Sequence, residues 1–425
     1  MNFNKLEIIF TILAISFGLA MSQGDYSRKM AIYGTSRAKS TVISTQNDSV
    51  GAIVEHSGIF SIGTAGGKSL LFGYPFSAQT SHTHFHIDGS LWGDYDDTIA
   101  GHPLPAPITV APHRVGDSII TSWTVDGVQF TQVLVPTYVG VNPQIRIEYR
   151  IENADAISHS VGLLLFLDTM IGTNDCAPIA TPLGYFESEQ EFVGDVPSFW
   201  QAFEESPFQP PDKLVGQGII IGADATPPDV LVYGNFWNYH SVGWDYTFAG
   251  GLFSDSAVLL RWNPIMLAPG NHRTIITYYG IGVADRTVGE ISMSLTYPEQ
   301  IRPAHCDGFS PDSFVITLFV SPEDTIGGAV ASLRTPPFLN IVGDDTKPII
   351  PSIVLPDMMG TASWNVAVSS DASTQTGTLS VELITPGYSP TSIEREIDIT
   401  APDGYPPDIS LVSEIPSPVV RDTLT

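Results

Sequence analysis

Residues 118–135, SIITSWTVDGVQFTQVLV, consist of two runs of alternating side chains separated by Asp126 and Gly127. An Asp-Gly pair accepts the positive φ angles of a tight turn, and a period of two is typical of a half-buried β-strand. The stretch therefore predicts a β-hairpin. Residues 144–168 repeat the theme with a longer connection, and their last part, VGLLLFLD, is apolar on both faces. Such a run predicts a strand that is covered from both sides inside a sandwich.

Strand patterns separated by Gly and Pro turns continue from about residue 41 to residue 285. One segment, residues 196–204 (VPSFWQAFE), instead favours a short helix, because Pro197 suits a first helical turn. Further strands are expected at residues 313–320, 360–370, 377–385 and 392–400, with the spacing of an immunoglobulin-like sandwich. The chain is therefore predicted to be all-β, and its 38 Gly, 33 Pro and 15% charged residues agree with turn-rich β-structure.

The first 22 residues have the pattern of a signal peptide, with Lys5 in a polar start, an apolar run over residues 8–20 and small residues before Gln23. We therefore expect a secreted or cell-surface protein. No later segment is apolar over the length of about 20 residues that crosses a bilayer, so no membrane span is expected. Residues 401–425 are interpreted as a linker and the start of an incomplete further domain.

The formal net charge of -27 argues against nucleic acid as a partner, because nucleic-acid binding needs a positive surface. Cations and neutral glycans are compatible with it. The two cysteines, Cys176 and Cys306, permit one disulfide in an oxidising compartment. The alternative is that they are two separate buried thiols.

Residues 81–90, SHTHFHIDGS, carry a histidine at every second position. In a strand, His82, His84 and His86 share one face, while Phe85 and Ile87 turn to the core. Two neighbouring histidines, such as His84 and His86, could hold a transition metal together with a carboxylate such as Asp94. The alternative is an exposed outer face that simply carries polar side chains.

A second candidate site follows the buried strand, in LDTMIGTNDCAP. Asp168, Asn174 and Asp175 offer oxygen ligands of the kind that Ca²⁺ prefers, so calcium is a candidate cofactor. Asp and Asn also form turns through bonds to their own backbone, which is the alternative interpretation. Downstream, Glu187, Glu189 and Glu191 alternate and are interpreted as a solvent-exposed edge.

A third candidate is the aromatic segment of residues 233–253. Aromatic rings can stack on the apolar faces of sugars, and neighbouring amides and carboxylates can bond their hydroxyl groups. Trp237 and Trp244 are expected to be exposed, while other rings seal the segment against the sandwich. The predicted ligand-binding set is Trp237, Asn238, Tyr239, Trp244 and Asp245.

Several segments together resemble a pattern in large, mostly uncharacterised secreted proteins of bacteria and archaea. They are GKSLLFGYPF (67–76), HIDG (86–89), LDTMIGTND (167–175), VPSFWQAFE (196–204) and DSAVLLRWNP (255–264). The resemblance implies a galactose-mutarotase-like β-supersandwich over residues 23–290, followed by an immunoglobulin-like domain over residues 300–400. That fold hosts sugar epimerases and polysaccharide lyases as well as modules without catalysis. No catalytic pair of the family maps onto this sequence, so no catalytic residue is assigned.

These observations favour a non-catalytic secreted or cell-surface protein that serves in adhesion or carbohydrate binding, with glycans or other surface proteins as partners. No G-x-S-x-G, H-E-x-x-H or phosphate-loop motif is present. One alternative is a carbohydrate-active enzyme of lyase or epimerase type on the same fold, with His84 or His86 facing a cleft beside Asp94. Another is a structural spacer within a larger surface protein.

Overall fold

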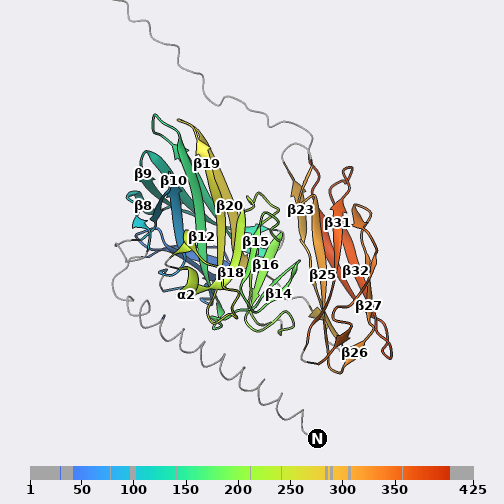
Figure 1. Cartoon of the computed structure of the whole chain (residues 1–425). Helices are drawn as coiled ribbons and strands as arrows, with labels where there is room; N and C mark the ends of the chain where they lie inside the picture. The colour runs from blue at the N-terminus through green and yellow to red at the C-terminus, as the bar shows by residue number, and fades with distance from the viewer. Residues whose placement is uncertain are drawn as a thin grey trace, which may run out of the picture.

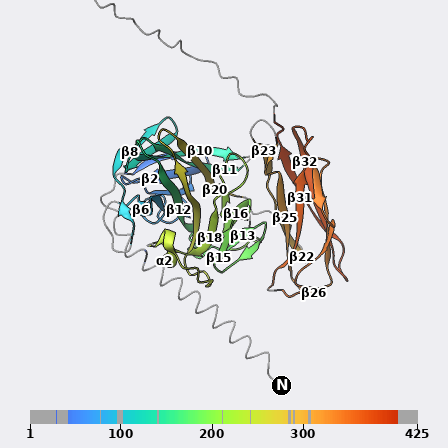
Figure 2. The ribbon, with the colours of Figure 1, turned by 45° about the horizontal axis from the view of Figure 1, so that its top comes forward.

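A computed structural model describes Lys29 and residues 42–402, apart from residues 77, 96–101, 140–141, 211, 241, 283–285, 288–290, 305–307 and 357. It consists of two β-sandwich modules that lie side by side (Figures 1 and 2). The first module contains β1 to β20 and the second contains β21 to β33. Each module has its own large apolar core. The prediction of an all-β chain is confirmed.

One sheet of the first module is called the lid sheet, because a loop described below covers its outer face. Its main path runs through β1 (Ile43–Gln46), β2 (Val50–Val54), β3 (Phe60–Thr64), β4 (Ser69–Leu71), β12 (His159–Gly172), β19 (Ser256–Leu267), β18 (Val230–Asn235) and β15 (Gln190–Val193). A branch adds β5 (His82–Ile87), β6 (Ser90–Gly93) and β7 (Leu104–Pro105), with β5 paired to β12.

The other sheet of the first module is called the interface sheet, because it faces the second module. Its order is β14 (Gly184–Phe186), β13 (Ile179–Thr181), β16 (Phe199–Phe203), β17 (Val215–Ile219), β20 (His272–Ile281), β11 (Asn142–Asn153), β10 (Val128–Val139), β9 (Ser118–Val125) and β8 (Ile108–Val115).

Strand β12 is apolar on both faces because its alternate side chains enter two different buried apolar clusters. Leu163, Leu165 and Leu167 point into the core between the two sheets. Leu164 and Phe166 point the other way and belong to a second apolar cluster on the outer face of the lid sheet. The prediction of a strand covered from both sides is therefore confirmed.

The hairpin over residues 118–135 is also confirmed, with β9 and β10 paired on either side of the turn. Asp126 and Gly127 have φ angles of 49° and 76°, which are the positive values that a type I′ turn requires. The next connection is different: β11 belongs to the interface sheet and β12 to the lid sheet, so residues 154–158 cross between the sheets.

The helix predicted for residues 196–204 is wrong, because this segment forms strand β16. Trp200 and Ala202 point into the main core, whereas Phe203 points toward the second module. Both faces are buried, so the apolar run carried no helical or strand periodicity that could distinguish the two.

The second module consists of two main sheets around Trp364. One has the order β21 (Arg286–Thr287), β22 (Ile291–Thr296), β25 (Ser313–Pro322), β31 (Gly360–Val368) and β28 (Leu339–Val342). The other has the order β24 (Phe309–Ser310), β23 (Gln300–Pro303), β33 (Thr391–Ile399), β32 (Gln375–Ile384), β27 (Val330–Arg334) and β29 (Thr346–Pro348), and β26 (Ile326–Gly327) pairs with β30 (Ile353–Val354). The four strands predicted here are confirmed as β25, β31, β32 and β33.

A buried apolar contact joins the modules. Phe319 of β25 is fully buried and packs with Ala180, Phe203 and Val215 of the interface sheet. The Thr317 hydroxyl, also on β25, donates to the carbonyl of Pro182. The modules therefore meet through buried side chains as well as through the chain that links them.

Two sequence predictions concern parts of the chain outside the described residues. They are the signal peptide of residues 1–22 and the incomplete domain, of which only residues 401 and 402 are described. Within the described residues, no helix has both the length and the apolar character needed to cross a membrane.

Candidate functional site

The outer face of the lid sheet is covered by residues 236–252, which we call the lid. The lid contains the helix α2 (Phe236–Tyr239) and the short 3-10 helix η2 (Gly243–Asp245). Phe236 and Tyr239 are buried against Leu164 and Phe166 of β12. The lid therefore packs on the sheet through its own apolar core, and Figure 1 shows α2 lying across β18 and β12.

Glu189 fastens the lid to the rest of the module. Its carboxylate accepts hydrogen bonds from the side-chain amides of Asn235 and Asn238 at 3.1 and 2.9 Å, and from the backbone N–H of Gly250 at 3.0 Å. Its side chain is buried. The interpretation of Glu189 as part of an exposed edge is therefore wrong, because an ionised carboxylate becomes stable at low exposure when several donors surround it.

The histidine row, His82, His84 and His86 on β5, lies under this lid. Phe85 and Ile87 point into the core as expected, and the histidines share the opposite face. However, His82 and His84 are buried and His86 is half-buried. The interpretation of this face as an exposed polar surface is therefore wrong. The sequence pattern gave the correct face but could not reveal that a loop more than 150 residues away covers it.

Two of these histidines have direct polar neighbours at the start of the adjacent loop. Nε2 of His84 lies 2.7 Å from the Tyr95 hydroxyl. Nδ1 of His82 lies 3.5 Å from a carboxylate oxygen of Asp94, whose other oxygen accepts the backbone N–H of Thr83 at 2.9 Å. Burial lowers the pKa of His84 to about 3 and raises the pKa of Asp94. His84 is therefore neutral at physiological pH.

Two further histidines extend this cluster toward the lid. The ring of His102 lies 5.0 Å from the Tyr95 ring and 5.5 Å from the ring of His240. His240 stacks on Phe236 of α2 at 4.4 Å. Burial lowers the pKa of His240 to about 4, so this imidazole is also neutral at physiological pH. Neither histidine had been singled out from the sequence.

Among the residues that the structure describes, no third ligand joins the predicted transition-metal pair, His84 and His86. In the described part of the chain, Asp168, Asp175 and Asp255 form a group of possible metal ligands whose ligand atoms lie within 4.8 Å of one another. No histidine belongs to this group. His86 instead stacks on Trp244 of the lid, with ring centroids 4.9 Å apart.

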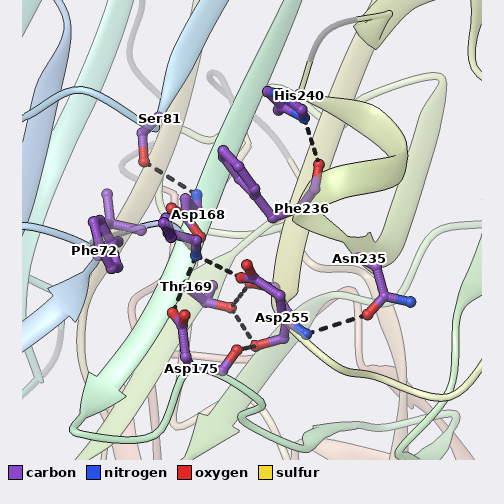
Figure 3. Close-up of polar contacts among 12 residues, drawn as sticks. Phe72, Ser81, Asp168, Thr169, Asp175, Asn235, Phe236, His240 and Asp255 are labelled. Carbon is purple, nitrogen blue, oxygen red and sulfur yellow. Dashed lines mark hydrogen bonds and ion pairs between the residues drawn. The ribbon is translucent and has the colours of Figure 1, made fainter. Parts of the chain in front are cut away.

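The aspartate cluster, Asp168, Asp175 and Asp255, is buried at the end of β12 and the start of β19 (Figure 3). The ammonium group of Lys29 lies at its centre. Nζ is 2.8 Å from Oδ1 of Asp168, 3.2 Å from Oδ1 of Asp175 and 2.5 Å from Oδ1 of Asp255. A side chain from the N-terminal segment thus occupies the position that a bound cation would take.

The charges of this cluster do not balance. Three carboxyl groups surround one ammonium group, and all four side chains are buried. Burial raises the pKa of Asp168 and of Asp255, since the charged form loses its hydration. Burial alone would lower the pKa of Lys29, but the three carboxylates raise it above its usual value. The site therefore favours one positive charge together with at least one protonated carboxyl group.

The predicted calcium ligands are brought together only in part. Asp168 and Asp175 converge, but the side-chain amide of Asn174 donates to the carbonyl of Glu204 and its oxygen accepts the N–H of Cys176. Asn174 therefore has the turn-forming role that was the alternative interpretation. Asp255 takes its place, and its position directly before a strand that pairs with β12 is the signal that could have identified it.

The predicted disulfide stays a prediction. The thiol of Cys176 donates to the carbonyl of Ser254 at 2.8 Å, and Cys306 lies outside the described residues.

The predicted ligand-binding residues all belong to the lid, in different environments. Tyr239 is buried, Trp237 and Trp244 are half-buried, and Asn238 and Asp245 are exposed. Trp244 has His86 on one side, and the Arg261 guanidinium lies 5.8 Å from its ring centroid. Trp237 and Trp244 are less exposed than expected, because both pack against the apolar cluster under the lid.

No protein-family model matches this sequence, and no match is found among curated protein sequences. Among solved structures, a putative aldose 1-epimerase from Escherichia coli K12 is similar, with a TM-score of 0.38, 10% identity, and coverage of 58% of this chain and 100% of that one. A galactose mutarotase-like protein from Lactobacillus casei has a TM-score of 0.35 and 9% identity, with coverage of 57% and 100%. A polysaccharide lyase has a TM-score of 0.29 and 10% identity, with coverage of 86% and 47%. Likeness at this level assigns no activity to the chain.

Proposed function

We propose that this chain is a secreted, non-catalytic β-scaffold in which the two modules act as one rigid support for the lid. The buried contact around Phe319 is the observation that carries this proposal. Two modules joined only by a linker move independently, whereas a buried apolar contact resists such motion. Asn142 adds a second tie at another point, because its side-chain amide donates to the Glu299 carboxylate at 2.7 Å.

The polar groups under the lid support a structural role for that region. The aspartate cluster is filled by Lys29, and the His84 ring contacts Tyr95. The lid backbone also lies directly against His84, since a Cβ atom added at Gly243 would be 2.3 Å from the His84 ring. A substrate that reached these groups would have to displace the lid and its core.

The lid is proposed to bind a neutral glycan on its outer surface. Phe248 is 41% exposed, and exposed Asn238 and Asp245 belong to the same segment. An exposed ring can stack on a sugar face, while amide and carboxylate groups accept or donate bonds to hydroxyl groups. Phe248 rather than Trp244 is the stacking residue in this proposal, because the Trp244 ring already stacks on His86 and has the Arg261 guanidinium 5.8 Å from its centroid.

A glycan array probed with the purified chain tests this function. Phe248→Ala should weaken binding about tenfold, the size expected for losing one stacking ring. Phe76→Ala is the matched control, since Phe76 is 64% exposed and lies in another part of the module. Equal losses in both variants, or the absence of any bound glycan, would contradict the proposal.

A carbohydrate-active enzyme is the second candidate, favoured by one observation. Nδ1 of His82 lies 3.5 Å from a carboxylate oxygen of Asp94, and an imidazole beside a carboxyl group is a typical general-base arrangement. A panel of polysaccharides and aldoses assayed for β-elimination and epimerisation discriminates the two. Turnover that disappears in Asp94→Asn would favour the enzyme over the scaffold.

A further inference from the structure

We propose that Lys29 and Asp255 form an intramolecular isopeptide bond. The two residues are 226 positions apart in the sequence, and Nζ of Lys29 lies 2.5 Å from Oδ1 of Asp255. This is the shortest of the three contacts that the amine makes with the aspartate cluster. No rearrangement of the backbone is needed to bring the nucleophile to the carboxyl group.

Aromatic rings shield this pair from water. Nζ of Lys29 lies 4.5 Å from the ring centroid of Phe72 and 4.6 Å from that of Phe236, and Figure 3 shows both rings beside the aspartates. The side chains of Lys29 and Asp255 have no exposed surface. In such a site, amide formation is favoured over hydrolysis, because the released water leaves and a dry environment disfavours the separated charges.

The neighbouring carboxyl groups provide the proton transfers. The ammonium group of Lys29 must lose a proton before it can attack, and Oδ1 of Asp168 lies 2.8 Å from Nζ to accept it. The second oxygens of Asp168 and Asp255 are buried and make no hydrogen bond. A buried carboxyl group without a donor favours the protonated form, and this is the form of Asp255 from which a hydroxyl group can leave.

The reaction is a condensation in which all atoms and charges balance. Neutral Nζ of Lys29 adds to Cγ of protonated Asp255, so that an N–C bond forms and a tetrahedral intermediate results. Asp168 returns its proton to the departing hydroxyl group, the C–O bond breaks and one water molecule leaves. The nitrogen then gives its surplus proton to the Asp168 carboxylate, which ends protonated and carries the proton that the ammonium group first lost. The product is an amide, and no oxidant, reductant or further reactant takes part. The fixed positions of Lys29 and Asp255 accelerate the reaction, because groups held in contact react at high effective concentration.

This bond would tie the N-terminal segment to the start of β19, beside the lid. Cross-links that close long loops restrict the unfolded chain. The bond would also hold Phe236 and α2 in place through the packing of the Lys29 side chain on that ring. The proposal does not depend on glycan binding, since it concerns the chain's own residues.

Peptide mapping of the purified chain by mass spectrometry tests the proposal. The expected result is a branched peptide pair joining Lys29 to Asp255, with a mass lower by one water molecule than the sum of the two peptides. Detection of the two unlinked peptides alone would overturn the proposal. A bond from Lys29 to Asp168 or Asp175 would also overturn it, because Asp255 is the assigned partner.

Two variants show that the bond forms by this chemistry. Lys29→Arg keeps a positive charge in the cluster but supplies no nucleophilic amine, so the branched peptide should be absent. Asp255→Asn should give the same linked product, with loss of ammonia in place of water. Absence of the bond in Asp255→Asn folded like the native chain would contradict Asp255 as the acceptor. The native chain decides the question on its own if a variant fails to fold.

Discussion

Nε2 of His84 lies 2.7 Å from the hydroxyl group of Tyr95, and both side chains are buried under the lid. The strand that carries His84 has its other face in the main core. A sheet that is buried on both sides gives its polar groups little hydration. Their protonation is therefore linked to folding, and this linkage can be measured.

The stability of the first module should fall as the pH drops below about 6.5. The pKa of His84 is about 3 in the folded chain and near its ordinary value of 6.5 when unfolded. At pH values between these two pKa values, His84 binds a proton in the unfolded state but not in the folded state, so acid favours unfolding. The expected loss is about 1.4 kcal/mol for each pH unit. Urea unfolding at pH 7, 6 and 5 measures it.

His84→Phe should make this dependence less steep, since it removes one titrating group, while His240, whose pKa is about 4, keeps its own contribution. His272→Gln is the control, because His272 is exposed on β20 and the substitution should leave the slope unchanged. Parallel curves for the native chain and His84→Phe would show that His84 is not the group responsible.

Gly243→Ala should destabilise the lid. The new Cβ atom would lie 2.3 Å from the His84 ring, and Gly243 has a φ of +42°. We expect a cost of about 1–3 kcal/mol in the free energy of unfolding, the range for overpacking. Gly250→Ala is the matched control, because it also has a positive φ, +69°, but its Cβ would meet nothing closer than 3.6 Å. The contact with His84 is refuted if the two variants are equally stable.

Lys29→Ala should destabilise the chain at neutral pH and create a calcium site. Without the Lys29 amine, neither its ion pairs nor the isopeptide bond can form, and three buried carboxyl groups remain. Losing a buried partner in this way costs about 3–5 kcal/mol. Their oxygens lie within 4.8 Å of one another, an arrangement that can converge on Ca²⁺. Millimolar calcium should therefore raise the melting temperature of Lys29→Ala but not that of the native chain.

Lys29→Ala combined with Asp255→Ala is the control for this effect, because it removes one of the three carboxyl groups. It should respond to calcium more weakly than Lys29→Ala alone. An unchanged melting temperature of Lys29→Ala in calcium would mean that the aspartate cluster binds only the lysine.

Local pattern predicted much of the β-structure, because alternation and turn residues act over a few positions. The Asp126-Gly127 hairpin and the doubly buried strand β12 follow directly from that pattern. Segment 196–204 was misassigned, since a run that is apolar on both faces fits a buried strand as well as a helix. The sequence also grouped the three histidines of β5 on one face, as the structure has them.

The candidate site was harder to predict, because it is assembled from distant segments. Asp168 and Asp175 stood out as oxygen ligands, but Asp255 and Lys29 join them from 80 or more positions away. Nothing in the neighbourhood of Lys29 marks it as a core residue. The burial of His84 likewise depends on the lid, which comes close to the His84 ring at Gly243. The residues around β5 do not indicate that the lid covers them.

Calorimetric unfolding of the native chain tests the central claim, that the two modules form one rigid scaffold. We expect a single transition whose enthalpy accounts for both modules, since the buried contact at Phe319 couples them. Phe319→Ala should separate this into two transitions, because a buried Phe→Ala change costs about 3–5 kcal/mol. Two well-separated transitions in the native chain would contradict the claim.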